Sequence, residues 1–206
     1  MAKREQRVRA RFPRVGGFIL AAASPKQSTV AWGSGAYGEE LVGAVVDGLA
    51  DEGVLALHDR RIPGRRANID HLAFAPAGVF VIDAKRYNGC RVEMRRVRSW
   101  RAPTRYLLLV GGRDRSQLVT DLVAQVAVVR QALSRLPGGD AIPVLPVLAF
   151  VDGRLPLLGQ LSLDGVQIVS VKQLATLLRQ PGELLFEQRQ AAQAHLWREL
   201  PSYTQG

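Results

Sequence analysis

The stretch from Asn68 to Lys85 constrains the fold of this chain more than any other part of the sequence. It contains two short apolar runs, residues 72–74 and 79–82, and the proline and glycine between them favour a turn. The second run is apolar at every position and rich in β-branched and aromatic residues, which is typical of a strand covered on both faces. The stretch therefore predicts two neighbouring strands joined by a tight turn.

Charged residues interrupt the second strand where it ends. Asp83 and Lys85 are two positions apart, so a strand places both side chains on the same face. Asp70, in the preceding strand, adds a second carboxylate near the same place. Two carboxylates form a hard oxygen site that suits Mg²⁺, and a lysine beside them is placed to activate water or to neutralise charge on a phosphate. We take these three residues as the candidate active site; an ordinary surface ion pair between Asp83 and Lys85 is the structural alternative.

The composition indicates one globular domain that binds an anionic partner. The chain has 206 residues, of which 47% are hydrophobic and 22% charged, enough for one sizeable core. Its formal net charge of +10 favours nucleic acid as the partner, ahead of an acidic membrane surface. Cys90 is the only cysteine, which excludes a disulfide framework and a cysteine-based zinc site. Because no apolar run is long enough to span a bilayer, we expect no membrane segment.

Basic residues are concentrated in two places. Lysine and arginine crowd residues 3–14 without apolar periodicity, and we expect residues 1–32 to form a loosely ordered basic arm that helps to hold a phosphate backbone. A signal peptide is the alternative for this arm, but its basic region is long, contains Pro13 and precedes only a short apolar run, so we expect a cytoplasmic protein. The second place is a basic loop and a nearby strand end, where the candidate nucleic-acid contacts are Arg60, Arg61, Arg65, Arg66 and Arg86.

Hydrophobic periodicity elsewhere predicts further helices and strands. Helical spacing marks residues 38–53, 116–136, 171–179 and 182–200. Strand-like runs cover residues 54–57, 91–97, 106–110, 144–151 and 166–170. Pro146 in the fourth of these runs indicates a partly open edge or a bulge. The order predicts a single α/β domain with a central mixed β-sheet flanked by helices.

Two further patterns carry weaker functional interpretations. Residues 33–38 match the dinucleotide fingerprint G-x-G-x-x-G, but Glu39 and Glu40 would put negative charge where the pyrophosphate must bind. The three histidines are scattered and lack metal-ligand spacing, which argues against zinc chemistry. His71 follows Asp70 and therefore faces away from it, so we expect it to be packed rather than catalytic.

Several motifs in a fixed order resemble the nuclease-related domain (NERD) family of the restriction-endonuclease-like PD-(D/E)xK superfamily. They are Gly-Ala-Tyr-Gly-Glu-Glu at residues 35–40, Asn-Ile-Asp-His at 68–71, and Gly-Val-Phe-Val-Ile-Asp-Ala-Lys at 78–85 with Gly89 after it. The helix around Gln125 and the strand at residues 143–150 also fit. The similarity extends over residues 33–180, and the final helix and tail at residues 181–206 lie outside it.

The resemblance implies a restriction-endonuclease-like fold with a metal-dependent phosphodiesterase site. In such a site Asp70 and Asp83 hold a divalent ion, Mg²⁺ or in its place Mn²⁺, and Lys85 acts on the water or the scissile phosphate. Glu39 is the acid contributed by the helix, although the helix macrodipole offers a structural explanation for it. Gln125 is an accessory residue. Asp83 stands where the family more commonly has glutamate, which shortens the reach to the metal by one methylene group.

Two functions follow from these observations. The first is a Mg²⁺-dependent nuclease that hydrolyses phosphodiester bonds in DNA. The second is a nucleic-acid-binding or adaptor module of the same fold that cuts nothing. The intact set of Asp70, Asp83 and Lys85 favours the enzyme.

Overall fold

The structure is a computed structural model, and it describes residues 32–203 except residues 66, 99, 101–102 and 157–159. The basic arm expected at residues 1–32 therefore lies outside the described residues, apart from its last position. The helices are α3 (Trp32–Asp47), α4 (Gln117–Leu133), α5 (Val171–Leu178) and α6 (Phe186–Glu199), with short 3-10 helices η1 (Ala50–Glu52) and η2 (Gly139–Ala141). The strands are β1 (Leu55–Arg61), β2 (Asn68–Ala75), β3 (Gly78–Arg86), β4 (Val92–Val97), β5 (Arg105–Val110), β6 (Arg113–Asp114), β7 (Val144–Val151), β8 (Leu161–Leu163) and β9 (Val166–Ser170).

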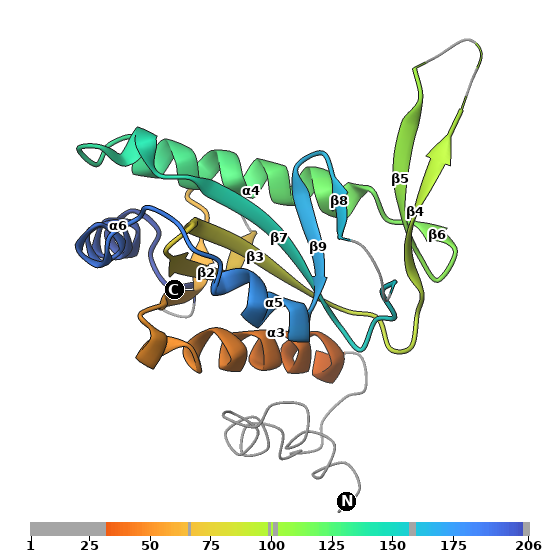
Figure 1. The fold of residues 1–206 in the computed structure, drawn as a ribbon, viewed down its shortest axis with the longest axis horizontal. Coiled ribbons are helices and arrows are strands. Elements are labelled where there is room, and N and C mark those ends of the chain that lie inside the picture. The colour runs from red at the N-terminus through yellow and green to blue at the C-terminus, as the bar shows by residue number, and fades with distance from the viewer. Residues whose placement is uncertain (1–31, 66, 99, 101–102, 157–159, 204–206) are drawn as a thin grey trace, which may run out of the picture.

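A six-stranded mixed sheet, in the order β1-β2-β3-β7-β9-β8, forms the centre of the molecule (Figure 1). β1, β2 and β3 form an antiparallel meander, β3, β7 and β9 are parallel neighbours, and β8 is antiparallel to β9. Parallel neighbours require a crossover connection, and α4 lies in the connection between β3 and β7. The α/β fold with a mixed sheet predicted from the sequence is thus confirmed.

Helices cover both faces of this sheet and divide the apolar core into two layers. On one face α4 and α6 pack over side chains such as Leu72 and Val81. On the other face α3 and α5 pack over side chains such as Ala73 and Ile82. Side chains alternate along a strand, and adjacent residues therefore enter different layers. No helix in the described part of the chain is both long and apolar enough to cross a membrane.

The first helix differs from its prediction in where it begins. The apolar stripe starts at Gly38, but α3 begins at Trp32 and ends at Asp47, and η1 then leads into β1. Glu39 and Glu40 consequently lie beyond the first turn, so the macrodipole explanation for these acids is wrong. Residues 33–38 are helical, whereas the dinucleotide fingerprint requires a loop between a strand and a helix, and the match is coincidental.

Pro146 lies in a central strand, at a point where one side of that strand is open, as the sequence predicted. β3 pairs with β7 along the whole of β7, but the pairing of β7 with β9 begins only at Val147. At Pro146 the strand therefore has a hydrogen-bonded neighbour on one side only, where the missing N–H is tolerated.

A second, three-stranded antiparallel sheet in the order β4-β5-β6 stands beside the first (Figure 1). The chain enters this second sheet from β3 and leaves it into α4, so the second sheet is inserted in the connection between β3 and α4. Val92, Leu108 and Val110 at its base belong to the core under α4. The outer parts of β4 and β5 extend away from the rest of the molecule.

Candidate active site

A cavity of about 310 Å³ opens where the start of β2 and the end of β3 face the first half of α4. The three residues selected from the sequence, Asp70, Asp83 and Lys85, line this cavity together. The strands bring them together because β2 and β3 are antiparallel neighbours and all three side chains project toward α4. The remaining lining consists of Arg65, Asn68, Asp121, Gln125 and four apolar or small side chains.

The carboxyl group of Asp83 is buried, that of Asp70 is half-buried at the cavity, and the two are close enough to influence each other. Asp83 is 5% exposed, and Oδ2 of Asp70 accepts a hydrogen bond from the backbone N–H of Ala84 at 3.1 Å. Burial, followed by the charge of Asp83 and a hydrogen bond with it, raises the pKa of Asp70 to about 8, against the opposing effects of Lys85 and the Ala84 N–H. Burial and the neighbouring carboxyl group thus favour the protonated form of Asp70 when no cation is bound.

Lys85 contacts one of these carboxylates directly. Its Nζ donates to Oδ1 of Asp83 at 2.5 Å, as the spacing of two residues in a strand predicts. The side chains are 29% and 7% exposed, so this is not an ordinary surface ion pair. Burial alone would lower the pKa of Lys85, but the charges of Asp83, Asp70 and Glu39 outweigh it and raise the pKa. The lysine stays positively charged beside the cavity.

Glu39 approaches the same group of charges from α3. It is exposed and does not line the cavity. Partial burial raises the pKa of Glu39, the charge of Lys85 lowers it, and the charges of Asp59 and Asp83 raise it. Its electrostatic effect on Lys85 is reciprocal, which places the two side chains in the same local field.

Gly38 allows α3 to come this close to the end of β3. A Cβ at this position would lie 3.3 Å from the Cβ of Arg86 and 3.9 Å from its backbone nitrogen. The guanidinium of Arg86 lies over the ring of Tyr37, 4.6 Å from its centroid, and fixes the same helix turn against the strand. Close packing of α3 against β3 thus explains why glycine precedes the two glutamates in the motif at residues 35–40.

Gln125 supplies the one orphaned oxygen in the lining. Its Oε1 is buried and has no hydrogen-bond partner among the described residues. Buried polar atoms are almost always satisfied, so an unpaired amide oxygen on a residue that lines a polar cavity indicates a missing ligand or water. The sequence resemblance selected this residue as accessory, and its position in the cavity lining is consistent with that role.

Two acids near the site were not among the residues selected from the sequence. Asp121 lines the cavity one helical turn before Gln125, a spacing that places both on one face of α4 and offers a sequence signal. Asp59 lies within β1 with a left-handed φ of 52° and accepts a hydrogen bond from Nδ2 of Asn68 at 2.7 Å. Such a conformation is uncommon for a residue other than glycine and recurs at functional sites, but no local sequence pattern announces it.

The donor set fits a hard divalent cation. Asp70 and Asp83 offer carboxylate oxygens, and Gln125 offers an amide oxygen with no other partner. No group of three or more histidine, cysteine, aspartate or glutamate side chains in the described residues is arranged to hold a metal. Mg²⁺ does not require such a group, since it commonly binds through one or two carboxylates and keeps several waters. The residues suit Mg²⁺ or Mn²⁺ better than zinc.

Arg60 was wrongly selected as a nucleic-acid contact. Its side chain is 5% exposed, and its guanidinium donates to the backbone carbonyls of Leu200 at 2.7 Å and Trp197 at 2.9 Å. It therefore binds the C-terminal end of α6 to β1. A buried arginine with these partners is not available to a phosphate.

The other basic candidates differ in how accessible they are. Arg61 and Arg65 are exposed, and Arg65 also lines the cavity. Arg86 is partly buried and forms an ion pair with Asp152 at 3.2 Å. Arg66 lies outside the described residues. The structure thus leaves Arg61 and Arg65 as the basic side chains best placed to meet a ligand at the cavity.

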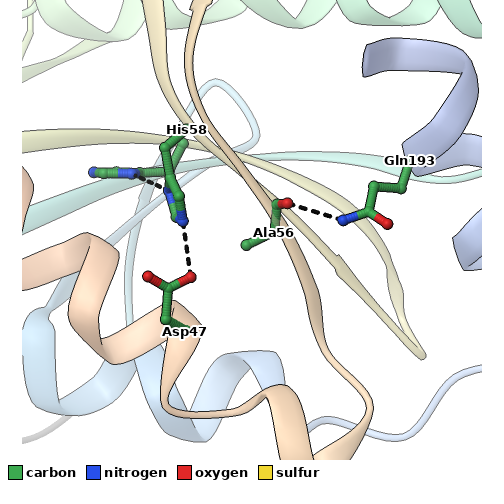
Figure 2. Close-up of polar contacts among 5 residues, drawn as sticks. Asp47, Ala56, His58 and Gln193 are labelled. Atoms are coloured by element: carbon green, nitrogen blue, oxygen red, sulfur yellow. Dashed lines mark hydrogen bonds and ion pairs between the residues drawn. The ribbon is translucent and has the colours of Figure 1, made fainter.

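Two of the three histidines meet, contrary to the expectation that all are scattered. Nδ1 of His58 lies 2.8 Å from Nδ1 of His71, and Nε2 of His58 lies 2.9 Å from Oδ1 of Asp47. Figure 2 shows the side chains of His58 and Asp47 pointing toward each other. Burial and the neighbouring His58 lower the pKa of His71 to about 3, so His71 is neutral. Its side chain lies on the α3 side of the sheet, away from Asp70, and is packed as predicted.

The fold and the cavity define a class of protein: an α/β domain that carries paired carboxylates and a lysine at the ends of adjacent strands. The model of the nuclease-related domain family matches residues 34–151, which include Glu39, Asp70, Asp83, Lys85 and Gln125. The chain belongs to this family, which is part of the PD-(D/E)xK superfamily. Comparisons with curated proteins and with solved structures found no match.

Proposed function

We propose that this protein is a metal-dependent nuclease that hydrolyses phosphodiester bonds in DNA. One observation carries the proposal: a buried and a half-buried carboxyl group and a charged lysine line one cavity in a chain of the nuclease-related domain family. The reaction adds water across one P–O ester bond and leaves a phosphate monoester and a hydroxyl group. A second observation agrees with the substrate, since the net charge of +10 favours a polyanion.

Asp70 and Asp83 would hold the cation, Mg²⁺ or Mn²⁺, with Oε1 of Gln125 as a further oxygen donor. When bound, the ion supplies a water of lowered pKa and stabilises negative charge on the scissile phosphate. The raised pKa of Asp70 means that this carboxyl group releases a proton before it can act as a ligand.

Lys85 would act on the phosphate or on the attacking water. Asp83 holds its ammonium group at the cavity, and the surrounding acids raise its pKa and keep it charged. A fixed positive charge in a partly dry site stabilises the negative charge that develops on phosphate oxygens. Glu39 contributes to this charge state from α3 and is a positioning residue rather than a ligand in the cavity.

Cleavage by the Lys85→Ala variant tests the proposal. The purified chain is incubated with supercoiled plasmid, linear duplex and single-stranded DNA in the presence of Mg²⁺ or Mn²⁺. We expect Lys85→Ala to lower the cleavage rate by about 10²-fold or more while DNA binding is retained, because one charge-stabilising donor is lost and both carboxylates remain. Lys172→Ala, at an exposed position of α5, is the matched control and should cut like the wild type.

A different outcome would support the binding module. If the wild type binds DNA but cuts no tested form with either ion, and Lys85→Ala behaves identically, the nuclease proposal fails. The chain would then be a nucleic-acid-binding or adaptor module of the same family.

A further inference from the structure

The hairpin formed by β4 and β5 projects from the rest of the molecule (Figure 1, upper right), although little of its outer part is buried. Its base is anchored, since Val92, Leu108 and Val110 are at most 3% exposed. Beyond the base, no residue of positions 95–98 and 105–107 is buried. We call these seven residues the outer hairpin. Strand pairing, such as Arg96 opposite Tyr106, joins its two sides.

This segment carries most of the excess charge of the chain. Residues 91–115 contain eight arginines and two acidic residues, a net charge of +6 out of the +10 of the whole sequence. Four of the arginines are exposed on the outer hairpin: Arg95, Arg96, Arg98 and Arg105. None of these four forms an ion pair with a side chain among the described residues, whereas Arg91 near the base pairs with Glu93. Like charges at this density oppose one another, so the free protein gains nothing from placing them together.

The hairpin is also tied to both walls of the cavity. Only residues 87–91 separate it from β3, which carries Asp83 and Lys85. On its other side, α4 begins three residues after β6 and carries Asp121 and Gln125. Ser116 fixes this second connection, because its Oγ accepts a hydrogen bond from the backbone N–H of Leu108 at 3.0 Å. A ligand held by the outer hairpin would therefore be held at a fixed position relative to the cavity.

The shape and chemistry of the hairpin fit duplex DNA. Each of its strands spans roughly 20 Å, and a two-stranded ribbon is narrow enough to enter or follow a groove of the duplex. Duplex DNA presents about one phosphate charge per 1.7 Å of axis, so several phosphates fall within this length. Tyr106, which is 47% exposed, adds a polar aromatic surface beside Arg96. An acidic membrane would match the charge and would also accept Trp100, which is 90% exposed between β4 and β5, but it would not match the shape of the narrow ribbon.

We propose that the outer hairpin is a DNA-binding arm that grips the duplex through its phosphates beside the cleavage site. The assignment rests on the proposed function for the choice of DNA as partner. It goes further by naming the element that binds the flanking duplex. The basic loop after β1 then serves the cavity itself.

Salt-dependent binding of a short fluorescent duplex tests the arm. The variant Arg95→Gln/Arg96→Gln/Arg105→Gln removes three charges from the outer hairpin, and Lys172→Gln/Arg179→Gln/Arg198→Gln removes three exposed charges from α5, its C-terminal end and α6. Both are measured without divalent ions, so that no DNA is cut. We expect the hairpin variant to flatten the slope of log affinity against log salt by about 2 to 3, since each lost phosphate contact removes about 0.9. The control variant should keep the wild-type slope.

The possible outcomes separate the arm from the nuclease. The arm proposal fails if the wild type and the hairpin variant have equal slopes. It also fails if the hairpin variant and the control variant lose affinity equally. Binding of the wild type to vesicles of anionic lipid but not to duplex DNA would overturn it in favour of a membrane. If the arm result holds and the wild type still cuts nothing with Mg²⁺ or Mn²⁺, the nuclease proposal alone fails. Circular dichroism of both variants checks that the fold is intact.

Discussion

Asp70 and His71 are consecutive residues of β2 whose side chains lie on opposite faces of the sheet, and burial acts on them in opposite directions. Burial is the largest cause that raises the pKa of Asp70 to about 8 and the largest that lowers the pKa of His71 to about 3. The physical reason is the same in both cases, because a buried group favours its uncharged form. In the absence of a cation burial therefore favours the neutral form of both residues.

The buried histidine makes stability depend on pH. In the folded state His71 titrates near 3, whereas an unfolded histidine titrates near 6.5, so between these values only the unfolded chain binds the proton. The contribution of His71 to the free energy of unfolding should therefore fall as pH falls from about 6.5 toward 3, while the raised pKa of Asp70 acts in the opposite direction over much of this range. Between pH 6.5 and 5 this one residue contributes at most about 2 kcal/mol. Urea unfolding of wild type and His71→Gln at both pH values isolates the effect, and parallel losses in the two proteins would contradict it.

Alternation along a strand is the reason that the central site residues are predictable. Asp83 and Lys85 share a face by spacing alone, and the hairpin to β2 brings Asp70 beside them. Arg60 shows the limit of this reasoning. Its partners, the carbonyls of Trp197 and Leu200, are far away in the sequence, and no local pattern records which distant backbone group a side chain meets.

At the scale of elements, the contact between α3 and β3 depends on a glycine. Gly38 sits where a Cβ would lie 3.3 Å from the Cβ of Arg86, while a Cβ at Gly35 would meet nothing within 4 Å. Alanine is favoured over glycine in a helix by about 1 kcal/mol, so Gly35→Ala should leave stability unchanged or raise it. Gly38→Val should instead push the helix away from the strand end and carry Glu39 away from Lys85.

We expect Gly38→Val to lower the cleavage rate and the midpoint of thermal unfolding together. Gly35→Val, which adds the same side chain to the same helix, is the control and should change cleavage little. Cleavage assays and circular dichroism melts measure the two effects. If the Gly38→Val protein folds and cleaves DNA at the rate of the wild type, the close approach of α3 to the end of β3 does not matter for the site.

The length of an element decides whether the sequence predicts it. The long periodic segments were predictable: the ends of α4, β3 and β7 lie at, or a few residues from, the ends of the expected ranges. β6 and β8 contain two and three residues, too few for any period, and the sequence does not predict them. The early start of α3 was also hidden, because Gly33 and Gly35 disfavour a helix and its buried face begins only at Gly38.

At the scale of the whole molecule, α6 closes the core although it lies outside the family match. Ala192 and Leu196 are fully buried in the layer under α4, and Nε2 of Gln193 donates to the carbonyl of Ala56 at 2.9 Å (Figure 2). The helix is thereby bound to β1 at several points along its length, including the hydrogen bonds from Arg60. We therefore expect residues 181–203 to unfold together with the sheet.

Truncation of one buried side chain in α6 tests whether this helix and the sheet unfold together. Leu196→Ala leaves a cavity against the main core and should lower the free energy of unfolding by about 2–4 kcal/mol in a single transition. Trp197→Ala, one position along, removes a side chain that is 59% exposed and keeps the backbone carbonyl bound by Arg60, so it should have a much smaller effect. Urea unfolding is followed by circular dichroism and by tryptophan fluorescence in the Leu196→Ala protein. If α6 were an independent appendage, Leu196→Ala would give two transitions. The unfolding midpoint of the sheet would then stay unchanged, because the stability of the strands would not depend on the side chain of Leu196.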